Sequence, residues 1–559
     1  MNGAAVGLGS EEWYLACQEA LDLLRFVRDH DKNEEEEAAV KLSRSILGQP
    51  QDHIVENVSP KFAEDFLRGV VVLLDKAENL ERACASLDRF GKTNHGKRIL
   101  ERSLTPSFVT QALDTPSVEV KTLICRQVKR VVGGGQKEEK DEAAAAMMTK
   151  STEEKLELLK CVASCLRDEE LGVNQVASEC FESAAYSLSD DSQALDFIVR
   201  TLRGLVPDLS SEESVRIVHT LINVSKASDL SFSCFVGSGV MDVIVNALRS
   251  SSDQLTKICL VEMFLFMVAD ELDSGVTNTR GVKTSKLAVH FAKATGEALM
   301  EIILSREDIP VMLRGQSMQL LASLQSLCCE EDPAFQIDSK LMEVMLANVK
   351  GRDTELTRST LNATTGFLVS RNGVLTFLQN GLAASLVSFA FERGTDESVQ
   401  EDALHILGRF VSAATDRESA IKPIIFSTLS EYGSSLPDAL EHILNKPEDK
   451  LREGCYYCIS AIAKTEWGVM EICTKKSLIE RLSDAQSERE QTMANCRFKC
   501  VCEVNKTANS LVSSSKNQTD KLGVVVLETI SPLLSILQKS VEAGPFGDEA
   551  AMHIDFDAA

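Results

Sequence analysis

Eight apolar stripes with helical spacing recur along this chain at similar intervals. They begin at Val120, Val173, Val215, Leu255, Leu313, Leu356, Val399 and Leu451. Successive starts lie 53, 42, 40, 58, 43, 43 and 52 residues apart, so four of the seven intervals fall within the roughly 40–47 residue period of two large classes of helical repeat. One such repeat cannot bury its own apolar face and is stable only when stacked on its neighbours. The spacing therefore predicts a stack of helices with a long continuous surface.

Each stripe keeps one face of a helix apolar. In the stripe at Leu451, for example, Cys455, Cys458 and Ile462 follow at steps of four, three and four residues. The turns before the stripes supply cap oxygens and early acids at residues 116–117, 211–213, 353–354, 396–398 and 448–449. We therefore expect an all-α fold, an armadillo/HEAT-like right-handed superhelical solenoid.

The repeats are expected to occupy most of the chain. Residues 1–110 are interpreted as an N-terminal helical cap and first repeat, with helices over 11–28, 62–74 and 79–90, because terminal repeats usually lose the repeat pattern. Armadillo/HEAT-like repeats follow over 111–546, and the three longest intervals are interpreted as insertions. These are a flexible segment at 133–150, a loop at 270–285 and a proline-rich stretch over 423–447. A final helix is expected over 522–541, before an acidic disordered tail at 547–559.

The charge and cysteine content exclude several functions. A net charge of −25 without a dense run of Lys or Arg argues against nucleic-acid binding. The acidic surface either keeps a large solenoid soluble or steers it toward a basic partner. Most of the sixteen cysteines lie on apolar stripes, which is typical of reduced thiols. No stretch approaches the ~20 apolar residues of a membrane helix, and the densest, residues 259–269, contains Glu262. We expect a soluble protein of the cytoplasm or nucleus.

Motifs for chemistry are absent or incomplete. Residues 91–97 have the spacing of a phosphate loop, but Arg98 replaces the hydroxyl residue that would hold magnesium, and a helix rather than a strand precedes them. Cys455 and Cys458 resemble half of a zinc site, yet both lie on one core stripe. No HExxH, GxSxG or GxGxxG motif is present. The chain is therefore predicted to be no enzyme and to carry no metal or cofactor.

A peptide-binding armadillo groove needs a ladder of Asn and Trp side chains on successive third helices. Asn223 fits one rung, but Ala461 replaces the corresponding asparagine, and Trp467 is expected to pack the connection after its helix. Glu262 either lines a groove or faces water at the edge of its helix, and the second reading is favoured. The surface is therefore expected to recognise a folded domain.

Four segments resemble a known family. Residues 117–132 (SVEVKTLICRQVKRVV), 253–264 (DQLTKICLVEMF), 452–472 (REGCYYCISAIAKTEWGVMEI) and 543–546 (AGPF) are similar to the proteasome 26S non-ATPase regulatory subunit five family, armadillo-like chaperones of proteasome base assembly. The resemblance implies a protein that binds the C-terminal domain of one AAA ATPase subunit through its concave face. It would help that subunit join its base-assembly partners and then leave before the complete proteasome forms. The segments at 133–150 and 270–285 depart from the family.

If this resemblance holds, the binding face comes from the third helix of each repeat. Its polar positions are Arg216, His219, Asn223, Arg358, Asn362, Glu401, His405 and Arg409. The alternative is a generic armadillo scaffold or adaptor for another folded partner.

Overall fold

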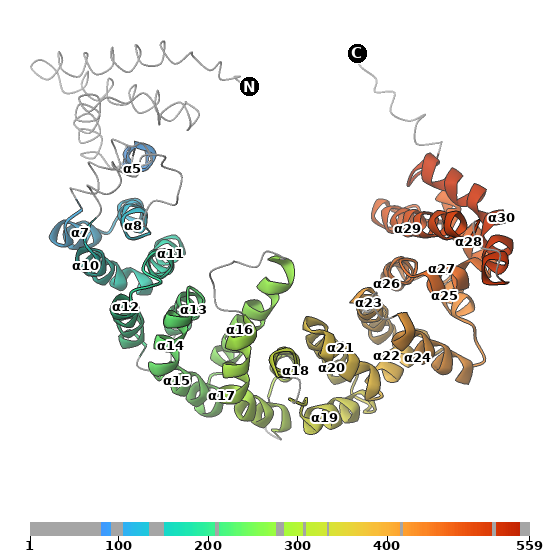
Figure 1. Ribbon diagram of the computed structural model, residues 1–559, viewed down its shortest axis with the longest axis horizontal. Helices are drawn as coiled ribbons and strands as arrows, with labels where there is room; N and C mark the ends of the chain where they lie inside the picture. The colour runs from blue at the N-terminus through green and yellow to red at the C-terminus, as the bar shows by residue number, and fades with distance from the viewer. Residues whose placement is uncertain are drawn as a thin grey trace, which may run out of the picture. The chain divides into compact units, whose positions relative to one another are not determined.

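The computed structural model describes residues 80–90, 104–133, 150–206, 212–274, 284–305, 309–332, 335–413, 418–516 and 521–547. Within these ranges all regular secondary structure is helical (Figure 1). The chain divides into two compact units, one of Met1–Ile244 with Asn278–Lys283 and the other of Val245–Thr277 with Thr284–Ala559. The expected all-α, armadillo/HEAT-like solenoid is confirmed, and each unit is described separately.

Unit 1 is a stack of short helices. Its elements are α5 (Leu80–Phe90), α7 (Pro106–Leu113), α8 (Val118–Val132), α10 (Thr152–Val162), η2 (Ala163–Arg167), α11 (Leu171–Ser187), α12 (Ser192–Gly204), α13 (Glu212–Ser225) and α14 (Asp229–Gly237). Helix α8 packs on α11, and α11 packs on α13, while α7, α10 and α12 form a second row. Helix α15 (Val240–Ser250) contains the boundary between the units.

Unit 2 contains the longer helices. They are α16 (Gln254–Ser274), α17 (Thr284–Leu304), α18 (Val311–Glu331), α19 (Ser339–Val349), α20 (Thr354–Ala363), η3 (Thr364–Val369), α21 (Arg371–Gln379), α22 (Leu382–Phe391), α23 (Glu397–Ala413), α24 (Glu418–Glu431), α25 (Leu436–Leu444), α26 (Asp449–Ile462), α27 (Glu466–Cys473), α28 (Lys476–Ser483), η5 (Ala485–Ser487), α29 (Gln491–Ser515) and α30 (Lys521–Ala543).

One row of unit 2 consists of helices that stack on one another in chain order. Helix α16 packs on α18, which packs on α20, and the contacts continue through α23, α26 and α29. In Figure 1 the helices α17, α19, α22 and α24 form the other row. Several repeats have an armadillo-like pattern of three helices, as in α21, α22 and α23, where α21 and α22 meet at a bend of 74°. We call α16, α18, α20, α23, α26 and α29 the third-helix row.

All eight predicted stripes lie on helices that stack in this manner. Those at Val120, Val173 and Val215 belong to α8, α11 and α13, and the other five belong to α16, α18, α20, α23 and α26. Helix α29 also belongs to the row, although no stripe was predicted for it. The repeat period thus identified the helices that carry the stack.

Most of the predicted caps form. Ser117 accepts a hydrogen bond from the backbone N–H of Val120, and Asp353 accepts one from Leu356. Asp396 likewise accepts from Ser398 and Val399 at the start of α23. The cap expected at Glu448 is wrong, because the side chain of Glu448 makes no capping bond to α26. There Asp449 contributes only a negative charge in the first turn.

The stripe residues form the core between the helices. Cys455 and Cys458 are completely buried on α26, and Phe377 and Phe410 stack with ring centroids 3.9 Å apart. Full burial of such side chains contributes about 1.5–3 kcal/mol each. The interpretation of Cys125, Cys180, Cys455 and Cys458 as core residues is confirmed, whereas Cys259 is half-buried.

One interpreted insertion is wrong. The stretch between the stripes at Val399 and Leu451 holds α24 and α25, which complete a three-helix repeat rather than interrupt it. Pro423 lies inside α24, and Pro437 occupies the first turn of α25, where a missing N–H costs nothing. The long interval therefore contains two ordinary helices of a repeat.

The other predicted segments are only partly described. The ends of the loop expected at 270–285 are helical, because α16 continues to Ser274 and α17 begins at Thr284, and residues 275–283 lie outside the described residues. Helix α5 matches the predicted helix 79–90, and α30 matches the predicted final helix. The helices expected over 11–28 and 62–74, most of the segment 133–150 and the tail beyond Gly547 lie outside the described residues.

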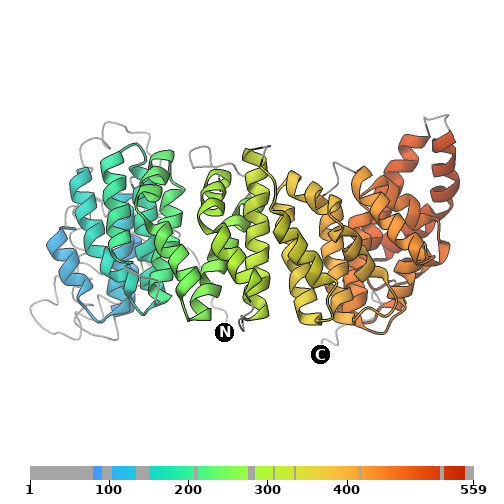
Figure 2. The same cartoon turned by 90° about the horizontal axis from the view of Figure 1, so that it is seen from below.

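Helix α30 contradicts the expectation that no apolar stretch of this chain approaches the length of a membrane helix. Its segment Val524–Ala543 has a mean hydropathy of 1.4 and is long and apolar enough to cross a membrane by length and composition. Two bent pairs, α14 with α15 and α21 with α22, meet the same criteria only if each pair is counted as one span. In unit 2, α30 packs against α29 and fully buries Ile530 and Leu537, and Figure 2 shows these two helices in red at one end.

A buried charged cluster joins the last two repeats. Glu488, only 5% exposed, accepts hydrogen bonds from Arg452 Nε (3.1 Å), Arg481 Nη2 (2.9 Å) and the Tyr456 hydroxyl (2.8 Å). The burial of Glu488 raises its pKa, but the bonds from Tyr456 and the two guanidinium groups outweigh burial and hold the pKa below its ordinary value. The cluster ties α26 and α28 to the turn before α29.

Arg497 anchors the end of α30. Its side chain is completely buried on α29 and donates to the carbonyl oxygens of Leu482 (2.7 Å) and Pro545 (2.8 Å). The Gly-Pro-Phe segment at residues 544–546 is thereby fixed to α28 and α29.

Candidate functional site

The third-helix row of unit 2 carries a set of polar contacts between successive helices. Between α20 and α23, Arg358 Nε donates to Asp402 Oδ2 (2.7 Å), and Asn362 Nδ2 reaches the same oxygen at 3.4 Å. The bond from Asp402 raises the pKa of Arg358. Arg358 remains 42% exposed, so the pair is accessible to a partner. We call these contacts and their equivalents along the row the third-helix ladder.

The next rung joins α23 to α26. The rings of His405 and Tyr457 lie with centroids 5.3 Å apart at an interplanar angle of 39°. Close approach of the two helices depends on Gly408, because a Cβ there would lie 2.8 Å from two Tyr457 ring carbons. Tyr457 is exposed, and Arg409, one turn after His405 on α23, is exposed as well. This rung offers an aromatic surface with a neighbouring cation.

The first rungs join α16 and η3 to α18. Glu262 Oε1 accepts a hydrogen bond from Gln316 Nε2 (2.9 Å), and Gln319 Nε2 donates to Thr365 Oγ1 (3.1 Å) in η3. Glu262 is therefore a half-buried member of the ladder. The favoured interpretation of Glu262 as a residue at the edge of its helix stays a prediction, since the side chain is half-buried and also accepts a hydrogen bond from Gln316.

Three predicted site residues belong to α13 in unit 1. Asn223 Nδ2 donates to Glu182 Oε1 of α11 (2.9 Å), and burial raises the pKa of Glu182 despite this bond. Arg216 pairs with Glu212 on its own helix (3.3 Å), and His219 is exposed. The Asn223–Glu182 bond joins successive helices of unit 1, as the ladder contacts do in unit 2, whereas Arg216 pairs on its own helix.

The structure thus groups the predicted residues into two sets. Arg358, Asn362, Glu401, His405 and Arg409 lie on α20 and α23 of unit 2, while the other three lie on α13. Sequence reasoning missed Asp402 and Tyr457, which receive the contacts from these helices. Asp402 lies three residues before His405, a spacing on the same helix face that could have revealed it.

Trp467 does not pack a connection as expected. It lies inside α27, is 7% exposed, and meets Phe426 of α24 edge-on at a centroid distance of 6.1 Å. Lys422 lies 5.9 Å from the centroid of the same indole ring. Trp467 is a core residue between α24 and α27.

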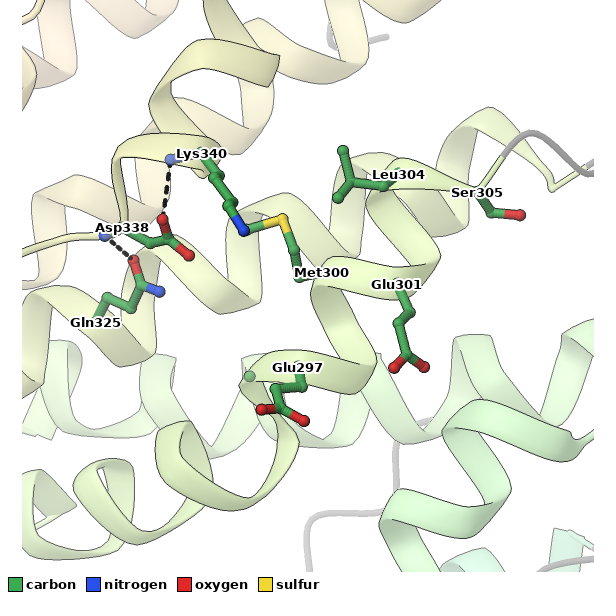
Figure 3. Close-up of a pocket in the computed structure, with 9 residues that line it drawn as sticks. Glu297, Met300, Glu301, Leu304, Ser305, Gln325, Asp338 and Lys340 are labelled. Carbon is green, nitrogen blue, oxygen red and sulfur yellow. Dashed lines mark hydrogen bonds between the residues drawn. The ribbon is translucent and has the colours of Figure 1, made fainter.

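A cleft of about 530 Å³ lies beside α17 and the start of α19 (Figure 3). Met300 and Leu304 give it apolar surface, and Glu297 and Glu301 belong to its lining. Both carboxylates are already paired with Arg249, at 3.1 Å each. Its carboxylates are occupied, so this cleft shows no arrangement of a nucleophile with a base.

Chemistry at thiols or metals has little support in the described ranges. No group of three His, Cys, Asp or Glu side chains there is placed to hold a metal ion. Burial raises the pKa of Cys458 and of Cys500 to about 12, so neither thiol ionises readily. A helix, α5, does precede the phosphate-loop-like segment, which itself lies outside the described residues.

No family model matches this chain, and no curated protein matches it. Several solved structures are similar to this chain. Yeast importin-beta (Kap95p) is 11% identical with a TM-score of 0.58, covering 95% of this chain and 63% of that one. The Kap95:Nup1 complex gives 10% identity, a TM-score of 0.53 and coverage of 96% and 67%. Kap121p, at 14% identity and a TM-score of 0.49, is covered over only 55% of its length.

These likenesses concern the fold, since all the identities are low. They place the chain among α-solenoids built from HEAT- or armadillo-like repeats. The chain spans 55–67% of the lengths of these solved structures.

Proposed function

We propose that this protein is a scaffold that binds another protein along its third-helix row, and that it acts as a chaperone for assembly of the 26S proteasome base. Its client would be an AAA ATPase subunit, and it would work in the cytoplasm or nucleus. The resemblance of residues 452–472 carries this proposal, because these residues form α26 and α27 beside the exposed His405–Tyr457 rung.

The character of the ladder supports a transient binding role. Its contacts are partly exposed pairs and hydrogen bonds, which contribute only about 0–1 kcal/mol each to stability. A partner can therefore exchange them for contacts of its own without unfolding the repeats. Tyr and Arg side chains such as Tyr457 and Arg409 are also the types that dominate binding at protein interfaces.

The alternative is a scaffold for a folded partner outside the proteasome. The likeness to importin-beta favours it only at the level of the fold, since a shared solenoid does not imply a shared partner.

A pull-down from native lysate, followed by mass spectrometry, tests the proposal. We expect enrichment of one or two proteasomal ATPase subunits without the proteolytic core. Recovery of intact proteasome, or of no proteasome subunit, would contradict the chaperone role and favour the alternative.

Reversing the charge of Arg409 is expected to weaken binding of the client ATPase domain about 10-fold without unfolding unit 2. Arg409 is exposed, and no hydrogen bond or ion pair of its side chain is seen among the described residues. Isothermal titration of Arg409→Glu against the purified domain, together with the melting temperature, measures both effects.

Arg358 needs a compensated design because it is paired with Asp402. Arg358→Glu would place two carboxylates together, so lost binding could reflect a local disturbance. The double variant Arg358→Asp with Asp402→Arg restores a pair while moving the charges. Unchanged affinity in both Arg409→Glu and this double variant would remove the ladder around α23 from the binding site.

A further inference from the structure

Helix α16 presents an unusual face to solvent. Leu255 is 65% exposed and Phe266 is 67% exposed, and Glu262 lies between them. The three residues are spaced seven and four apart, which places them along one side of a helix. This side is also the ladder side, because Glu262 contacts Gln316 of α18.

Helix α18 extends the same surface. Met312 is 52% exposed and lies one turn before Gln316, on the same side of the helix. We call Leu255, Glu262, Phe266, Met312 and Gln316 the α16–α18 patch. All five residues belong to unit 2.

The patch has acceptors that its own helices do not satisfy. The Gln316 amide donates to Glu262, but its oxygen Oε1 is buried and has no hydrogen-bond partner within the described residues. A buried carbonyl oxygen without a hydrogen-bond partner is unfavourable. A carboxylate and an amide thus form one hydrogen-bonded pair, on the helix sides that also carry the three exposed apolar side chains.

A cationic side chain is the group best suited to pair with the Glu262 carboxylate and the Gln316 amide oxygen. A Lys ammonium or Arg guanidinium donates several hydrogen bonds, and a bond to a carboxylate is roughly twice as strong as one between neutral groups. The apolar rim would exclude water from such a bond and strengthen it further. An acidic partner would instead place a second negative charge against Glu262.

We propose that the α16–α18 patch binds an amphipathic helix of the partner protein, with apolar residues against Leu255, Phe266 and Met312 and one Lys or Arg against Glu262 and Gln316. Helix-in-groove recognition uses apolar anchors at this spacing. The inference rests on the scaffold part of the proposed function and not on the proteasome as its setting.

A designed peptide pair tests the chemistry directly. The probe is a fluorescent alanine-based helix of about 20 residues with a leucine stripe and one central Lys, and its twin carries Glu instead. By fluorescence anisotropy we expect the Lys peptide to bind the full chain at least 10-fold more tightly than the Glu peptide. Glu262→Gln should weaken the Lys peptide by about 10-fold, and Phe266→Ser should weaken both.

Leu171→Ser is the matched control, since Leu171 is also 65% exposed but lies on α11 of unit 1. It should leave peptide binding unchanged. Equal binding of both peptides, no binding, or no effect of Phe266→Ser would overturn the proposal. So would a wild-type dimer that Phe266→Ser converts to monomer, because a second copy would then occupy the patch. Charge-selective peptide binding without any ATPase in the pull-down would sustain the patch and refute the proteasome role.

Discussion

Replacing Glu488 with Gln is expected to lower the free energy of unfolding of unit 2 by about 3 kcal/mol. The substitution keeps the shape of the side chain but removes the charge that Arg452 and Arg481 share. Arg481 then loses its counter-charge, and Arg452 keeps only its pair with the exposed Asp449. The expected cost lies at the lower end of the range for broken buried pairs, because both arginine side chains keep some contact with water. Urea unfolding measures it.

The same variant should show a defined pH dependence. The pKa of Glu488 is lower in the folded state than its ordinary value of 4.5. A lowered folded-state pKa gives stability that is complete above the unfolded pKa and is lost as the pH falls through the folded one. The difference in free energy of unfolding between wild type and Glu488→Gln should therefore be constant above about pH 5.5 and shrink below about pH 4.5. The other carboxylates contribute equally to the pH dependence of both proteins, so their effects cancel in this difference.

Glu490→Gln serves as the control for the charge change. Glu490 lies two residues away and is exposed, and its side chain makes no capping bond to α29. This variant should change stability by less than about 0.5 kcal/mol at every pH. A gap between wild type and Glu488→Gln that widens on acidification would contradict the proposed role of the cluster.

Gly468→Ala is expected to destabilise unit 2 by about 2–3 kcal/mol. A Cβ at Gly468 would lie 2.1 Å from the carbonyl oxygen of Ile462 and 2.5 Å from its Cγ2. The carbonyl belongs to the backbone at the end of α26 and cannot rotate away, so α26 and α27 must separate. In a Trp13→Phe background, the fluorescence of Trp467 during urea unfolding reports on this region.

Gly172→Ala provides the opposite expectation. Nothing lies within 4 Å of a Cβ at Gly172 in the first turn of α11, so alanine should stabilise that helix by up to about 1 kcal/mol. Circular dichroism can follow this variant. Destabilisation by Gly172→Ala as large as that by Gly468→Ala would mean that the close approach at Gly468 does not govern the effect.

The fold could be predicted because the same apolar stripe recurs along the chain. Each stripe needs only local information, namely which positions of a helix are apolar, and eight such stripes define a period. No stripe was predicted for α29 because its inward face includes small residues and the buried Arg497. The carbonyl partners of Arg497 come from distant segments. Helix α24 was missed because Pro423 suggested a break that tertiary packing overrides.

The candidate site was predictable only in part. The polar positions of α20 and α23 follow from helix periodicity, so Arg358 and His405 could be assigned to one face. Their partners Asp402 and Tyr457 depend on the register between neighbouring helices, which no local pattern contains. The exposure of Phe266 could not be predicted either, because an apolar residue in an apolar helix is expected to lie in the core.

The third-helix ladder also has a mechanical consequence. Fully buried apolar side chains hold each repeat together and hold it against the next, whereas the ladder adds only weak, hydrated links such as Arg358–Asp402. These links can break and form again while the apolar core stays intact. A partner that binds two adjacent third-helix positions at once would replace such links with its own contacts and hold the neighbouring helices more rigidly.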